Sequence, residues 1–140
     1  MDNFISIDFG TTACRIGYDR NGTFELVPNR YLDGRVPLLI KRSKSIPLEK
    51  RQNKSTPLFS FSSIKQKIGF EEEVPFDGKR VRVIDLASDI FRGLREDVKI
   101  NISEAFDNAV ITVPASFSEK QRAAMRAASE KAGFTYVKLL

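Results

Sequence analysis

The C-terminal stretch "NAVITVPASFSEKQRAAMRAASEKAGFTYVKLL" constrains the fold more strongly than any other part of the chain. "NAVITVPA" is a short apolar run rich in β-branched residues, which is typical of a central strand that is buried on both faces and ends at Pro114. The "SEKQ" at 118–121 is a capping box and Gly133 supplies a left-handed stop, which together predict a helix from about Glu119 to Ala132. "FTYVKLL" resumes as a strand, so this order of elements predicts a right-handed crossover between parallel strands.

A second pattern, in residues 3 to 27, predicts an antiparallel meander. Asn21-Gly22 stands between two runs of alternating apolar and polar residues, and both of its residues tolerate positive φ, so they predict a two-residue hairpin. Gly10 predicts the turn between the first strand and the second. Joined to the crossover, the meander predicts an α/β fold built on one mixed sheet.

Residues 30 to 104 predict a smaller α+β piece that is inserted into this sheet. "GRVPLLI" predicts a strand, and the polar residues that follow it as far as Ser55 predict the loosest region of the chain. Thr56-Pro57 is typical of a helix start and Gly69 of a helix end, so "LFSFSSIKQKI" is expected to be helical.

Two further elements are expected before residue 104. Asp77-Gly78 predicts a hairpin turn between two short strands in "EEVPFDGKRVRV". Apolar residues then recur at spacings of three and four, which predicts an amphipathic helix of about four turns. These apolar residues are Ile84, Ala87, Phe91, Leu94 and Val98.

Composition excludes several classes of protein. The chain has 140 residues, one cysteine (Cys14) and no histidine, so a disulfide framework is impossible and zinc would lack its usual ligands. No apolar stretch is long enough to cross a membrane. Of the net charge of +5, residues 30 to 67 carry +8, because they hold ten Lys or Arg and two acids. This segment lacks RNA- or DNA-binding motifs, so a solvated basic surface, or one that attracts phosphate, is favoured over specific nucleic-acid binding.

The N-terminal "IDFGTT" is the stretch most suggestive of a ligand site. It places a carboxylate, Asp8, beside a sharp turn whose backbone N–H groups and hydroxyls point the same way, and such concavities bind anions. An adjacent acid can hold hydrated Mg²⁺ against phosphates, and Gly10 permits close approach of the backbone to a ligand. The P-loop and the dinucleotide-binding glycine patterns are absent. The same residues also suit an ordinary β-turn, so both interpretations stay open.

Three segments in order resemble one family. "IDFGTT", "SSIKQKIG" at 62 to 69 and "NAVITVPASFSEKQRAAMRAASEKAGF" at 108 to 134 are similar to the DnaK-type, seventy-kilodalton heat-shock chaperones of the actin-like ATPase superfamily. The resemblance implies part of the first lobe of an actin-like, ribonuclease-H-like ATPase domain in a divergent member. It implies a core of 1–29 and 105–140, an inserted subdomain of 30–104, and no second lobe or substrate-binding domain in these residues.

The resemblance also implies which residues contact nucleotide. Asp8 would hold Mg²⁺ through water, and Gly10, Thr11 and Thr12 would bind the phosphates of ATP or ADP, with K⁺ as a possible further ion. Lys65 falls on the family's catalytic lysine, where its ammonium would stabilise charge at the γ-phosphate and orient the attacking water. Without the resemblance, Lys65 would be interpreted as an ordinary lysine on a helix surface.

Two more residues match the family's interdomain switch. Pro114 falls on the switch proline, and Arg122 falls on the arginine that relays nucleotide state towards the client-binding domain. From the residues alone, Pro114 is a strand terminator and Arg122 a solvated helix arginine.

The function implied is that of an N-terminal fragment of a cytoplasmic chaperone, which couples ATP hydrolysis to the binding and release of unfolded polypeptides. Co-chaperones would be its other partners, with no membrane and no specific nucleic acid. Because the family's nucleotide lies between two lobes, the fragment alone should turn over ATP negligibly. Leu139 and Leu140 end the chain within an apolar run, so self-association is expected. An actin-like structural or scaffold protein, or a basic binding module without catalysis, is the alternative.

Overall fold

The computed structural model describes residues 4–9, 14–20, 23–27, 38–41, 44–47, 59–70, 72–76 and 79–140. Its first three strands are β1 (Phe4–Phe9), β2 (Cys14–Arg20) and β3 (Thr23–Val27). They pair antiparallel in sequence order, with Ile7 opposite Ile16 and Gly17 opposite Leu26. The predicted meander is therefore confirmed, although its turn residues Gly10 and Asn21-Gly22 lie outside the described residues.

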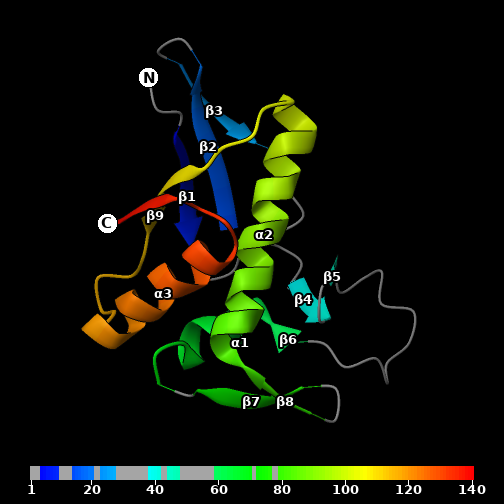
Figure 1. Cartoon of the computed structure of the whole chain (residues 1–140), viewed down its shortest axis with the longest axis vertical. Coiled ribbons are helices and arrows are strands. Elements are labelled where there is room, and N and C mark those ends of the chain that lie inside the picture. The colour runs from blue at the N-terminus through cyan, green and yellow to red at the C-terminus, as the bar shows by residue number, and fades with distance from the viewer. Residues whose placement is uncertain are drawn as a thin grey trace.

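The predicted crossover is also present. It consists of β9 (Asn108–Thr112), α3 (Glu119–Lys131) and β10 (Tyr136–Leu139). β9 pairs in parallel with β1 on one side and with β10 on the other, so the sheet has the order β10-β9-β1-β2-β3 (Figure 1). The expected α/β fold with a mixed sheet is confirmed at this level.

Local signals account for both ends of α3. The Ser118 side chain accepts a hydrogen bond from the Gln121 backbone N–H, while the Gln121 side chain accepts one from the Ser118 N–H. This is the predicted capping box, which satisfies N–H groups that the first turn leaves without partners. After the helix, Gly133 adopts φ +106°, which a side chain would disfavour.

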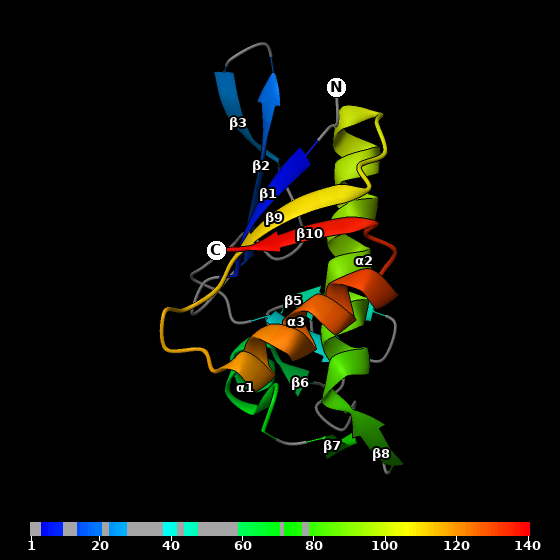
Figure 2. The same cartoon turned by 60° about the vertical axis from the view of Figure 1, so that its left-hand side comes forward.

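One face of the large sheet packs against two helices, α3 and α2 (Val83–Ile102). Along β1, Ile5, Ile7 and Phe9 are buried and the residues between them are exposed, as the period-two geometry of a strand requires. Phe9 meets Phe91 of α2 with ring centroids 5.8 Å apart. Figure 2 shows both helices on the same side of the sheet. Each large apolar side chain buried there stabilises the fold by about 1.5–3 kcal/mol.

α2 is longer than the four turns that its apolar spacing predicted. The predicted residues lie on its packed face, and the helix continues beyond Val98 to Ile102. It ends where Ser103 adopts a left-handed backbone with φ 63° and donates its N–H to the Lys99 carbonyl. The extra turn carries an exposed Ile100 and, four residues after Val98, an Ile102 that packs against the core, so the apolar spacing continues to the end of the helix.

The remaining elements form small sheets and one short helix. They are β4 (Leu38–Lys41), β5 (Lys44–Pro47), β6 (Phe59–Ser60), α1 (Phe61–Lys67), β7 (Glu73–Phe76) and β8 (Lys79–Arg82). β7 and β8 form the predicted antiparallel pair, with the predicted turn Asp77-Gly78 outside the described residues. β4 pairs with both β5 and β6.

Two expectations for this region are corrected. The helix predicted from Leu58 begins at Phe61, because Phe59 and Ser60 pair as a strand with β4. β5 lies within the polar stretch that was predicted to be the loosest, where its pairing with β4 overrides the weak local preference. Thr56-Pro57, the predicted helix start, lies outside the described residues.

Candidate functional site

The candidate site is the sheet edge at which the parallel strands β1 and β9 end. Asp8 and Thr112 stand directly opposite each other in the β1–β9 register. Both side chains lie on the exposed face of the sheet, and the Thr112 Oγ1 donates a hydrogen bond to the Asp8 Oδ1 across 2.9 Å. Ligands of α/β sheets commonly bind beyond the carboxyl ends of the strands, so this carboxylate has a suitable position for one.

A cation flanks Asp8 from the other neighbouring strand. Arg15 of β2 is the antiparallel partner of Asp8 and is exposed. Paired residues in adjacent strands project to the same face of the sheet, so Asp8 lies between Thr112 on one side and Arg15 on the other. The arrangement presents charge of both signs at the edge where the "GTT" of the opening motif follows β1.

Helix α1, which carries Lys65, is anchored at the same end of the molecule. Ile64 and Ile68 are fully buried, whereas Lys65 between them is partly exposed. Gly69 ends the helix with φ +83°, and a Cβ built on it would come within 2.6 Å of the Gln121 Cα. The end of α1 therefore lies directly against the first turn of α3, as Figures 1 and 2 both show.

The described part of the candidate phosphate loop ends at Phe9. Gly10, Thr11 and Thr12 lie outside the described residues, so their predicted contacts with phosphate stay predictions. Asp8 and Thr112 are the residues of this edge that the structure brings into hydrogen-bonding contact.

The chemistry of the edge fits a hydrated Mg²⁺ better than a metal held only by protein. The described residues contain no group of three or more His, Cys, Asp or Glu that could enclose a metal ion. Mg²⁺ is usually held by one or two carboxylates together with water and substrate phosphates. A carboxylate offers about four acceptor positions, and Thr112 uses one of those on Asp8. Asp8 can therefore accept hydrogen bonds from metal-bound water.

The two predicted switch residues lie on either side of the start of α3, Pro114 in the connection from β9 and Arg122 in the first turn of the helix. Pro114 follows β9, and its carbonyl accepts a hydrogen bond from the Phe117 N–H at 3.0 Å. Arg122 is partly buried and donates from Nη2 to the Leu139 carbonyl of β10 at 3.5 Å. It thus contacts the edge strand, which differs from a fully solvated helix arginine.

A groove separates α3 from the outer edge of β10. Its volume is about 340 Å³. Arg126 crosses it beside Arg122 and donates to the Val137 carbonyl. The lining residues are Glu119, Arg122, Ala123, Arg126, Ala127, Glu130 and Leu139.

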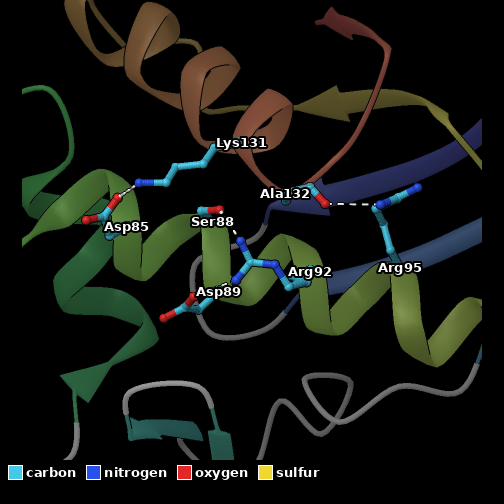
Figure 3. A network of polar contacts seen from close by, with 7 residues as sticks. All are labelled: Asp85, Ser88, Asp89, Arg92, Arg95, Lys131 and Ala132. Carbon is cyan, nitrogen blue, oxygen red and sulfur yellow. Dashed lines mark hydrogen bonds and ion pairs between the residues drawn. The ribbon is translucent and has the colours of Figure 1, made fainter.

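A separate network fixes the other end of α3 against α2 (Figure 3). Arg95 donates to the Ala132 carbonyl at 3.1 Å and to the Asp107 carboxylate at 2.9 Å. Lys131 pairs with Asp85 nearer the start of α2. These contacts hold the crossover in place, and the sequence analysis did not identify them.

Thr112 and Arg15 were also missed as candidate site residues. A signal for Thr112 was present, because it is the last residue of the apolar strand before Val113-Pro114, and parallel strands end at a shared edge. Arg15 could be found only once the β1–β2 register was known.

Comparison with known proteins relates the chain to one family. A family model described as Hsp70 protein matches residues 39–140, which is more than half of the chain. The proteins named "Chaperone protein DnaK" from Thermotoga neapolitana and Thermotoga petrophila are each 30% identical to it over 142 residues, covering 97% of this chain. The chain spans 24% of the length of these relatives.

Among the described helices, none has the length and apolar character needed to cross a membrane.

Proposed function

This chain belongs to the Hsp70 family, and we propose that it forms part of the first lobe of an ATPase domain with an actin-like, ribonuclease-H-like fold. In this assignment residues 1–29 and 105–140 form the core and 30–104 an inserted subdomain. The five-stranded mixed sheet with two helices on one face supports the proposal. The second lobe and a client-binding domain would belong to the part of the relatives that this chain does not span.

The proposed ligand is ATP or ADP with Mg²⁺, bound beyond the ends of β1 and β9, and K⁺ is a further ion of the same site. Asp8 would contact the metal through water, while Gly10, Thr11 and Thr12 would bind the phosphates. One observation carries this assignment: the Asp8 carboxylate is held by Thr112 at the shared carboxyl edge of two parallel strands. There, one carboxylate could face metal-bound water, and the residues that follow β1 in the sequence would bind phosphate.

The proposed reaction is transfer of the γ-phosphoryl group to water. The chemistry that Mg²⁺ would supply when bound is neutralisation of charge on the phosphate oxygens. Asp8 would hold the metal through water, and the Lys65 ammonium would stabilise charge at the γ-phosphate and orient the attacking water. No covalent enzyme intermediate is needed, because phosphoryl transfer of this kind depends on positioning and electrostatics. The docking of Gly69 against Gln121 supports this role for Lys65, since it holds α1 beside the connection from β9 to α3.

The whole protein would use this reaction to control its grip on unfolded polypeptides. Pro114 and Arg122 would relay the nucleotide state to the client-binding domain, and co-chaperones would adjust the cycle in the cytoplasm. This part of the proposal depends on family membership and on the placement of Pro114 before α3 and of Arg122 in its first turn. The 140 residues alone, with one lobe, would bind ATP weakly and turn it over negligibly.

Steady-state ATP hydrolysis by the full-length protein that contains this chain tests the proposal. Turnover is measured with and without an extended unfolded peptide, in the wild type, in Lys65→Ala and in Lys67→Ala. The last variant is the matched control, because it removes the same charge from the same helix. Stimulation by peptide, lost in Lys65→Ala and kept in Lys67→Ala, is the expected result. A rate indifferent to peptide and to Lys65 would contradict the proposal, and assembly of filaments on addition of ATP would then favour a structural protein.

A further inference from the structure

We infer that Thr112 is a positioning residue for Mg²⁺: its hydroxyl holds one oxygen of Asp8, so that the other oxygen faces metal-bound water. The inference rests on the proposed function, because it concerns the same nucleotide site. It adds a residue to which neither the sequence motif nor the resemblance assigned a role.

The hydrogen bond joins residues that the sheet itself fixes in place. Asp8 and Thr112 are register partners in neighbouring parallel strands. The preceding pair, Ile7 and Ile111, is 1% and 0% exposed, so the two backbones are anchored from the core side. Threonine is β-branched and its χ1 angle is restricted, so its Oγ1 has few alternative positions. The 2.9 Å contact therefore constrains the Asp8 carboxylate through a rigid neighbour.

The constraint on the Asp8 carboxylate matters because of Arg15, which lies on the other side of Asp8 in β2. Arg15 is the exposed register partner of Asp8 in β2, and a guanidinium is the usual bidentate partner of a carboxylate. Within the part of the chain that the structure describes, Asp8 bonds to Thr112 and forms no ion pair with Arg15. A carboxylate turned towards Arg15 would offer its oxygens to a cation of the protein in place of the metal-bound water. The Thr112 hydroxyl thus draws the Asp8 carboxylate towards β9 and away from the Arg15 guanidinium, which would otherwise compete with metal-bound water for its oxygens.

The test compares Thr112→Val with Thr112→Ser in the full-length protein. Valine keeps the β-branched shape and removes the hydroxyl, whereas serine keeps the hydroxyl. Binding of a fluorescent ATP analogue is titrated at a series of Mg²⁺ concentrations and again in excess chelator, so the readout does not depend on hydrolysis.

We expect Thr112→Val to raise the Mg²⁺ concentration for half-maximal binding about five- to tenfold, which is the scale of the net contribution of a typical intramolecular hydrogen bond. Thr112→Ser should stay near the wild type, and binding in chelator should be the same in all three proteins. In an Asp8→Asn background, Thr112→Val should add no further change, because its effect passes through Asp8. Adding Arg15→Ala to Thr112→Val should restore part of the lost response.

Several results would overturn the inference. An unchanged Mg²⁺ response in Thr112→Val, with only a lower melting temperature, would make Thr112 purely structural. An equal effect of Thr112→Val in the Asp8→Asn background would show that Asp8 is not the intermediary. If Thr112→Val does not fold, Thr112→Ala replaces it, and the same changes in Mg²⁺ response are expected of that variant. Each of these results is compatible with Mg²⁺-dependent nucleotide binding by the wild type, so none of them refutes the proposed function. A wild type that binds no nucleotide, or binds it without regard to Mg²⁺, would instead refute the proposed function and the inference together.

Discussion

Gly69 and Gln121 meet so closely that a Cβ on residue 69 would come within 2.6 Å of the Gln121 Cα and 2.7 Å of its backbone nitrogen. Gln121 is buried and belongs to the capping box of α3, so the end of α1 rests on a part of the backbone that is itself held in place. This contact positions the helix that carries Lys65.

Replacing Gly69 with alanine is therefore expected to destabilise the protein and to weaken nucleotide binding. The change forces a side chain into φ +83° and into contact with backbone that cannot move aside. We expect a loss of about 2–4 kcal/mol in the free energy of unfolding, from left-handed strain and overpacking together. Denaturant unfolding and ATP titration of the full-length protein measure the two effects.

Gly133→Ala is the matched control for Gly69→Ala. It also places a side chain at positive φ, but the nearest atoms belong to the Arg95 guanidinium instead of backbone. It should lower stability while leaving the affinity for ATP close to that of the wild type. Equal losses of ATP affinity in the two variants would show that docking of α1 on α3 has no specific role in the site.

Arg122 and Arg126 are expected to protect the edge of β10 that faces away from β9 from pairing with another copy. Among the strands that the structure describes, β10 is an edge strand of its sheet. They lie one turn apart on α3 and donate to the alternate carbonyls of Leu139 and Val137. An uncovered strand edge is a template for pairing with a second chain. The double variant Arg122→Ala/Arg126→Ala should therefore self-associate more strongly than the wild type, as measured by light scattering coupled to size exclusion.

The control for this experiment is Lys99→Ala/Lys120→Ala. It removes the same charge from exposed positions on α2 and α3. If both double variants self-associate to the same degree, reduced net charge is responsible and protection of the β10 edge is not.

Arg95→Ala is expected to cost more stability than Arg92→Ala, which removes the other arginine of α2. Arg95 donates to the carbonyls of Phe106 and Ala132 and to the Asp107 carboxylate, and its guanidinium lies 5.2 Å from the centre of the Phe134 ring. Removing it leaves partly buried acceptors without a donor, and we expect a loss of about 2–4 kcal/mol. Arg95→Lys should recover little, because an ammonium cannot reproduce the planar fork of donors.

Arg92→Ala provides the comparison. Its side chain is 53% exposed, whereas its partner Asp89, one turn away, is 12% exposed, so the loss of Arg92 should cost about 1–2 kcal/mol, less than the loss of Arg95. Thermal unfolding of both variants in parallel checks the difference. Similar costs for Arg92→Ala and Arg95→Ala would refute the view that Arg95 clamps the crossover to α2.

Ser118→Ala should lower stability by about 1 kcal/mol, the usual cost of losing an N-cap side chain. Ser118 accepts the Gln121 N–H at 3.2 Å, and its loss leaves that donor without its partner at the start of α3. Ser116→Ala, at an exposed position two residues earlier, should have little effect. Urea unfolding of the two serine variants distinguishes capping from a general effect of removing a hydroxyl.

Much of the fold was predictable because its signals are local. The alternation in β1, the capping box of α3 and the stop at Gly133 each depend on residues within a few positions of one another. From these patterns the meander, the parallel crossover and the mixed sheet could be assembled by general rules of chain connection. Asp8 could be proposed as a ligand-site residue from the same kind of local pattern, although these residues also suit an ordinary β-turn.

What only the tertiary structure decided depends on residues far apart in the chain. Phe59 and Ser60 read locally as helix, but pairing with β4 makes them a strand. The local sequence identifies Thr112 only as the end of an apolar run, because its hydrogen-bond partner Asp8 lies 104 residues away in the chain. Short-range patterns predict most of the elements, because helix and strand periodicities involve neighbouring residues. Which side chain stands beside Asp8 is determined by strand register, and register is settled only when the whole core packs.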